Sequence, residues 1–170
     1  MSSHNDRWVD ENALQHQLRD LVCLAMVGDH VRWVLTDDDE LGDWLAEAAS
    51  QWRGWAEQVA TRLVASQVAP DGRVRSLAKD IPLNWVPDGW LSGEAARPLV
   101  AERLARVAGW ARYRHSQAKG ADAELLGSVA AGLEAQLCAR RKSAGIRAKR
   151  ERRSQKAAVR AEHLRQHARW

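Results

Sequence analysis

The stretch of sequence that decides the fold is "ELGDWLAEAASQWRGWAEQVATRLVASQ", residues 40–67. Apolar side chains recur in it at spacings of three and four residues. They are Leu41, Leu45, Ala48, Trp52, Trp55, Val59 and Leu63. Because an α-helix has 3.6 residues per turn, this spacing places all of them on one face. The stretch therefore predicts a long helix that buries one face, with Asp39 as its N-cap.

Three further segments carry the same pattern, and one long connection interrupts it. The apolar positions are Leu14, Leu18, Leu21, Ala25 and Gly28 in residues 11–35, Val100, Leu104, Val107 and Ala111 in residues 94–119, and Leu126, Val129, Leu133 and Leu137 in residues 121–139. The connection, residues 69–93, contains two Pro-Asp-Gly turns, and residues 73–80 between them favour a short helix. An up-down-up-down bundle needs no such crossover. The sequence predicts an all-α fold, a ferritin-like four-helix bundle with a short helix in the crossover between helices two and three.

Composition limits what the chain can be. A length of 170 residues suits one domain, and no apolar run approaches the roughly 18 residues that a membrane span needs. The first residues lack the pattern of a secretory signal, which favours a cytoplasmic protein without a membrane partner. Cys23 and Cys138 are predicted to be buried, reduced thiols. The tryptophans within helical patterns are predicted to pack inside: Trp33, Trp52, Trp55 and Trp110.

Charge is divided unevenly along the chain. Residues 1–139 hold 14 Lys and Arg against 20 Asp and Glu, whereas residues 140–170 hold 12 against two. The first part is therefore about −6 and the second about +10, which gives the net charge of +4. We predict an N-terminal arm over 1–10, the helix bundle over 11–139 and a basic C-terminal tail over 140–170, helical or disordered.

The basic tail predicts a polyanionic partner. It carries no paired aromatics for base stacking and no zinc-ligand spacing, so it suits phosphate contacts without sequence readout. DNA is the preferred partner, and RNA, anionic lipid or a purely structural tail are the alternatives. The predicted DNA-binding residues are Arg140, Arg141, Lys142, Arg147, Lys149, Arg150, Arg152, Arg153, Lys156, Arg160, Arg165 and Arg169.

Three stretches resemble one known family. They are "GDHVRWVL" at 28–35, "WAEQVATRLVASQVAPDGRVRSLAKDIP" at 55–82 and "DAELLGSVAAGLEAQLCARR" at 122–141. Together they are similar to the DNA-protection-during-starvation (Dps) miniferritins over residues 11–140. The resemblance implies a twelve-subunit shell, DNA binding through flexible basic tails, and iron oxidation at a site shared by two subunits. It also implies a bacterial, nucleoid-associated protein.

The iron site that this resemblance implies is largely absent from the sequence. Arg32 stands where the family has a histidine before the tryptophan that matches Trp33. The other ligand positions fall on Gly42, Ala46, Glu57 and Thr61, and only Glu57 is a carboxylate. A guanidinium cannot ligate a cation, so Arg32 places positive charge where the metal would lie. Asp43 and His30 remain, with Glu57, as residual metal candidates.

Two functions therefore stand for comparison. The preferred one is a Dps-like DNA-binding, nucleoid-compacting stress-protection protein without ferroxidase chemistry and without a cofactor. The alternative is a miniferritin that oxidises and stores iron with altered ligands, and iron is expected only in that case. Both imply assembly with itself, as a dimer or dodecamer, or with a related subunit. On helix two the polar outer face, opposite the Trp52 stripe, is predicted to meet a partner subunit, where Glu57 pairs with Arg32 or Arg53.

Overall fold

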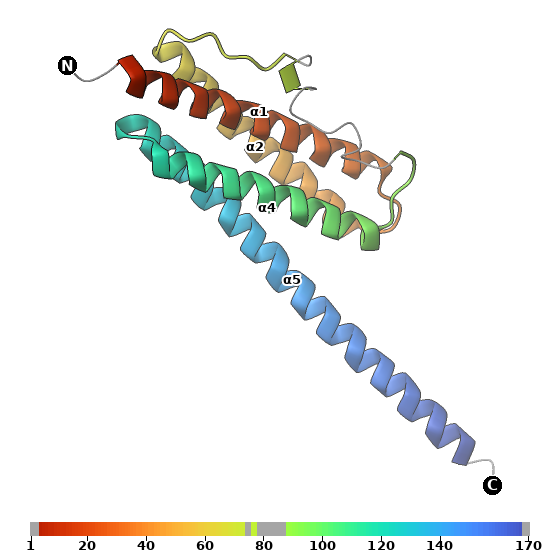
Figure 1. Cartoon of the computed structure of the whole chain (residues 1–170). Coiled ribbons are helices and arrows are strands. Elements are labelled where there is room, and N and C mark those ends of the chain that lie inside the picture. Colours follow the sequence, from red (N-terminus) through yellow and green to blue (C-terminus); the bar gives the residue numbers. More distant parts are fainter. Residues whose placement is uncertain (1–3, 74–75, 78–87, 168–170) are drawn as a thin grey trace. The chain divides into compact units, whose positions relative to one another are not determined.

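The computed structural model describes residues 4–73, 76–77 and 88–167 of the chain, and side chains from residue 12 to residue 158 of these. Four long helices make up the fold (Figure 1): α1 (His4–Val34), α2 (Asp39–Ala65), α4 (Gly93–Gln117) and α5 (Gly120–His167). By their packing, the residues divide into two compact units, 1–134 and 135–170. The first unit contains α1, α2, α4 and the start of α5. The predicted all-α four-helix bundle is confirmed.

The core of the bundle consists of the predicted apolar faces. The predicted inward residues of α1, α2 and α4 are all buried, as are Leu126, Val129 and Leu133 of α5. Trp52 is fully buried, and Ala49, on the adjoining part of α2, is buried with it. At ~25 cal/mol per Å² of apolar surface removed from water, these faces supply the main free energy of folding.

Two tryptophans of α2 pack against glycines on other helices. A Cβ at Gly28 of α1 would lie 2.8 Å from the Trp52 ring, and a Cβ at Gly132 of α5 would lie 2.3 Å from the Trp55 ring. No side chain larger than hydrogen fits at Gly132 without moving Trp55. Glycine at these two positions therefore lets large indole rings fill the space between helices.

The turn between α1 and α2 joins distant parts of the chain. Asp38 caps α2 by accepting from the Leu41 N–H, and both its oxygens accept from Arg97 of α4 at 2.6 and 2.7 Å. Asp37 accepts from the Gly93 N–H at 2.6 Å, at the start of α4. The predicted N-cap, Asp39, is wrong by one residue, because Asp38 is the residue held by Arg97 at the helix start.

The crossover is fastened to α1 near both of its ends. Asp71 accepts from Arg19 at 3.1 Å, and its backbone oxygen accepts from Gln15 at 3.1 Å. A side-chain hydrogen bond from Arg73 holds the pKa of Asp71 well below its ordinary value. At the other end, the Leu91 N–H donates to the Val34 oxygen at 2.9 Å. These contacts fix where the chain leaves and re-enters the bundle.

Several predictions need correction at the level of single elements. Helix α1 begins at His4, seven residues before the predicted start of the first helix at residue 11. Trp33 and Trp110 were predicted inside but are 66% and 50% exposed, because each lies off the buried stripe of its helix. Cys23 is buried as predicted, whereas Cys138 is exposed. Of the predicted crossover helix, Ser76 and Leu77 lie in helical backbone, and the rest falls outside the described residues apart from Arg73.

Candidate nucleic-acid interface and the predicted iron face

The predicted iron positions lie on the outer face of α1 and α2. On α2 the side chains of Asp43, Ala46, Glu57 and Thr61 are exposed, and Gly42 is half-buried. On α1, Arg32 is exposed and His30 is half-buried. This arrangement agrees with the expectation that the face opposite the Trp52 stripe points away from the core of the subunit.

Within one subunit these side chains do not form a metal site. Asp43 and Glu57 are 14 residues apart on one helix, which separates them by about 21 Å. Among the described residues, no group of three or more His, Cys, Asp or Glu could hold a metal ion. The residues at the predicted ligand positions therefore do not fit iron within a single chain.

One ion pair on this face was missed at the sequence level. Arg53 of α2 donates to Asp29 of α1, and the Asp29 side chain is 19% exposed. Arg53 had been predicted as a partner for Glu57 of another subunit. Residues 24 apart on two helices leave no local sequence signal, so only the packing of α1 against α2 reveals the pair.

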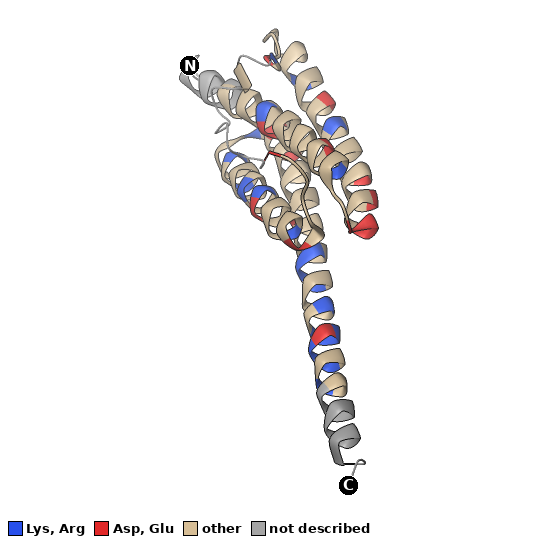
Figure 2. Cartoon of the chain, turned by 90° about the vertical axis from the view of Figure 1, so that its right-hand side faces the viewer, with Lys and Arg blue, Asp and Glu red and all other residues tan. Residues whose placement is uncertain are grey.

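The predicted DNA-binding residues lie on the C-terminal part of α5. This part is helical to His167. The predicted residues between 141 and 158 are all exposed, and Arg140 is half-buried. Arg160 and Arg165 lie in the helical backbone, and Arg169 falls outside the described residues. Lys and Arg recur along this part of α5 in Figure 2, with one acidic band among them.

Glu151 is the one acidic residue among the described side chains of the tail, and it has a basic neighbour. Arg147 lies 3.7 Å from Glu151, four residues along the same helix. Such an exposed pair contributes ~0.3–0.5 kcal/mol to helix stability. The pair also compensates one positive charge of the tail locally.

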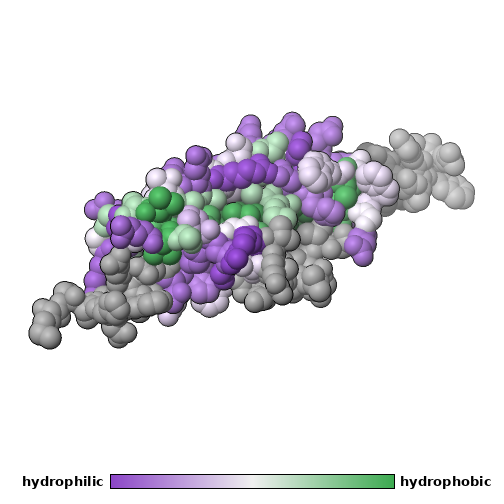
Figure 3. All heavy atoms as spheres, turned by 90° about the horizontal axis from the view of Figure 1, so that it is seen from above, coloured by the Kyte–Doolittle hydropathy of each residue, from purple (hydrophilic) through white to green (hydrophobic). Residues whose placement is uncertain are grey.

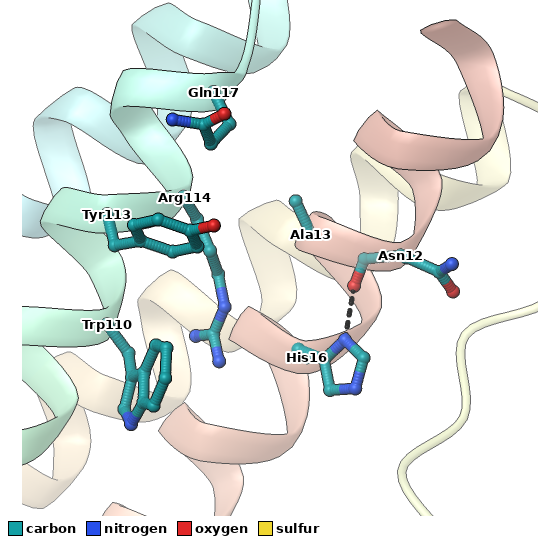
Figure 4. A pocket seen from close by; sticks show the side chains of 7 residues that line it. All are labelled: Asn12, Ala13, His16, Trp110, Tyr113, Arg114 and Gln117. Atoms are coloured by element: carbon teal, nitrogen blue, oxygen red, sulfur yellow. Dashed lines mark hydrogen bonds between the residues drawn. The ribbon is translucent and has the colours of Figure 1, made fainter. Parts of the chain in front are cut away.

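A hollow of about 410 Å³ lies between α1 and α4 (Figure 4). Trp110 and Tyr113 line it from α4 in an edge-to-face contact, with ring centroids 5.9 Å apart, and His16 lines it from α1. Arg114 also lines it, but its guanidinium donates to Asp20 at 2.6 Å and to Gln17 at 2.9 Å. Because this cation is already paired, the hollow is poorly suited to bind phosphate.

The described surface also exposes apolar side chains. Apolar side chains reach the surface in patches between hydrophilic ones (Figure 3), and the largest exposed ones include Met26, Trp33 and Val64. No helix of the described part of the chain is long and apolar enough to cross a membrane. Strong positive charge is concentrated on α5 beyond residue 139.

No protein-family model and no curated protein matches the chain. Solved structures do match. The structure of a Dps protein from Deinococcus radiodurans is 20% identical, covers 81% of this chain and 87% of its own, and has a TM-score of 0.77. Dps from Mycobacterium smegmatis is 19% identical, with coverage of 83% and 88% and a TM-score of 0.76. A Dps protein from Bacillus brevis is 17% identical, with coverage of 84% and 98% and a TM-score of 0.73.

These identities are low, whereas the shared geometry extends over most of each chain. The matched structures cover more than four fifths of this chain in all three cases. The predicted bundle, its crossover between the second and third long helices, and these matches agree. The chain therefore has the ferritin-like four-helix-bundle fold of the Dps miniferritins.

Proposed function

We propose that this protein is a Dps-like DNA-binding protein that compacts the bacterial nucleoid without oxidising iron. The observation that carries the proposal is the basic tail, with 12 Lys and Arg against two Glu over residues 140–170. Its charged side chains between 141 and 158 are exposed and accessible to phosphate. A partner polyanion would relieve their mutual repulsion and release its condensed counterions.

The rest of the chain favours binding through the tail rather than through the bundle. Residues 1–139 carry a net charge of about −6, which repels phosphate. Several arginines of the bundle are engaged with carboxylates, as in the Arg97–Asp38 and Arg114–Asp20 pairs. The hollow between α1 and α4 offers no uncompensated cation. DNA affinity should therefore follow the charge of residues 140–170.

Loss of ferroxidase activity is proposed from the substituted ligand positions. Gly42, Ala46 and Thr61 offer no carboxylate or imidazole, and Arg32 adds a cation. We expect ferrous oxidation by this protein to be little faster than in buffer alone. Rapid oxygen consumption with saturable, stoichiometric iron binding would overturn this part of the proposal.

Self-association is proposed through the outer face of α1 and α2. Ala46 and Ser50 are small exposed residues on α2 that permit close helix approach, and the apolar side chains of Met26 and Trp33 are half or more exposed on α1. An antiparallel two-fold pairing would bring Arg32 of one copy near Glu57 of another. We expect at least a dimer by light scattering, and a stable monomer at micromolar concentration would contradict this.

A gel-shift salt titration of the full chain and of a chain ending at Arg140 tests DNA binding. The truncation removes 11 basic and two acidic residues but none of the fully buried residues of α5. The shortened protein should keep its fold and lose most DNA binding. For the full chain, log affinity should fall linearly with log salt, with a slope of roughly −0.9 per phosphate neutralised. Equal retardation of DNA by both forms would refute the proposal.

Iron oxidation and storage remain the alternative function. Asp43 and Glu57 are both exposed on the same face of α2, so two subunits could bring these carboxylates together. Two of the matched structures are associated with iron: Dps from Microbacterium arborescens in a high iron form, and a Dps protein from Vibrio cholerae, a member of the superfamily of ferritin-like diiron-carboxylate proteins. Ferrous oxidation followed by absorbance separates the two functions, because only the alternative predicts turnover.

A further inference from the structure

The positive charge of the tail is arranged on one side of its helix. At 100° per residue, four basic residues fall within about 60° of each other around the helix axis. They form what we call the basic stripe: Lys142, Lys149, Arg153 and Lys156. The stripe extends from residue 142 to residue 156, about 21 Å along the helix. Arg141, Arg150 and Arg152 flank it, about 80–100° to either side.

The acidic residue among the described side chains of the tail lies on the opposite side. Glu151 falls about 170° from the centre of the stripe. Arg147, which lies near Glu151, is also on that side, about 140° from the stripe. The other described side chains on that side are small or polar, such as Ala144 and Gln155. The helix therefore has one strongly cationic face and one nearly neutral face.

The distribution of charge around the helix indicates which polyanion the tail can bind. A helix that lies in a membrane surface needs bulky apolar residues opposite its basic face, and Ala, Gln and Glu do not provide them. An α-helix, about 10–12 Å in diameter, fits the major groove of B-form DNA, which is about 12 Å wide. The major groove of an A-form RNA helix is too deep and narrow for it.

We infer that the tail binds B-form duplex DNA as a continuous helix, with the basic stripe toward the major groove and its flanking arginines on the phosphates to either side. This inference rests on the proposed DNA binding and adds the side of the helix, the form of the duplex and the residues that matter most. The flanking arginines contact phosphates, and the long Lys and Arg side chains of the stripe reach the phosphates along the edges of the groove, so binding remains independent of sequence.

Two exchanges of residues test the inference without changing composition, length or net charge. In the first variant, Glu151→Arg with Arg153→Glu moves an acid onto the basic stripe. In the control, Glu151→Ala with Ala144→Glu leaves the acid on the neutral face, three residues before Arg147 on the same helix. Circular dichroism checks that both full-length variants retain their helix.

Affinity for a duplex DNA, a duplex RNA of the same sequence and a single strand is measured by salt titration. The first exchange should weaken duplex DNA binding about tenfold at low salt and reduce the salt slope by about 1 or more, while the control stays within about twofold of wild type. Wild type should bind duplex DNA more tightly than duplex RNA. Equal affinities of the two variants, or equal binding of DNA and RNA, would overturn the inference and leave DNA binding intact. Failure of the wild-type protein to bind any of the three would instead overturn the proposed function.

Discussion

Both halves of α5 are rich in alanine, but they are stabilised in different ways. The first half buries Leu126, Val129 and Leu133 in the bundle, whereas almost every described side chain between 141 and 158 is exposed. The second half relies on the high helix propensity of Ala, Arg, Lys and Gln, and it must overcome repulsion between like charges. Burial thus fixes one half, while sequence-local preferences sustain the other.

The largest expected difference comes from removing buried apolar volume. Leu133→Ala should lower the free energy of unfolding by ~2–5 kcal/mol, because Leu133 is fully buried and its loss leaves a cavity. Ile146→Ala is the control in the second half, where the side chain is 58% exposed, and it should change the value by less than about 0.5 kcal/mol. Urea denaturation followed by circular dichroism measures both. Similar losses of unfolding free energy in the two variants would show that burial does not distinguish the two halves of α5.

Adding a methyl group should have opposite effects on stability in the two halves of α5. Gly132→Ala places a Cβ against the Trp55 ring and should destabilise the bundle by ~1–3 kcal/mol. Gly145→Ala meets nothing within 4 Å, so it should favour helix locally by ~0.5–1 kcal/mol and raise the helical signal slightly. Thermal melts and the ellipticity at 222 nm report the two effects. A stabilised Gly132→Ala variant would show that Trp55 does not occupy that space.

The ionised carboxylate of Asp71 also stabilises the bundle, and its contribution to the free energy of unfolding should depend on pH. The pKa of Asp71 is lowered by the hydrogen bond from Arg73, so the ionised form stabilises the fold above the unfolded pKa of about 3.9. The difference in unfolding free energy between wild type and Asp71→Asn should be constant from about pH 7 to 5. It should shrink as the pH falls below about 4. Asp88→Asn, an exposed position in the other Pro-Asp-Gly turn, is the control.

The smallest expected effect is a salt dependence of the tail helix. Screening of like charges should raise the helical content of residues 141–167 between about 0.05 and 0.5 M salt, because the Debye length falls from more than 10 Å to a few Å. The measurement is the difference in ellipticity between the full chain and a chain ending at Arg140. No change in that difference would mean that propensity outweighs repulsion throughout this range.

The sequence predicted the buried part of the fold because burial leaves a periodic signal. Every predicted apolar face was placed correctly, from Leu14 on α1 to Leu133 on α5. The same signal underestimated the helices at their ends. Helix α1 starts earlier than predicted and α5 continues far past Leu137, because exposed helix leaves no apolar stripe.

At the candidate sites, the charge of the tail could be predicted from the sequence, whereas the ion pairs between helices could not. The basic tail is a local feature of composition, so its charge could be recognised from the sequence alone. The pairs Arg53–Asp29 and Arg97–Asp38 join residues 24 and 59 positions apart, and no local pattern indicates them. The exposure of Trp33 was missed because an indole ring within a helical pattern was assumed to face inward.

Because the crossover is held to α1 near both of its ends, we expect it to tolerate changes in its own length. Asp71 on one side and Leu91 on the other are both held to α1 or its end, so the chain is anchored to α1 on both sides of the segment between them. Lengthening a closed loop costs little entropy, about 0.6 kcal/mol for each doubling. Insertions between these two anchors should therefore be accepted during evolution or engineering, and the crossover offers a place where a reporter sequence could be introduced without re-registering the helices.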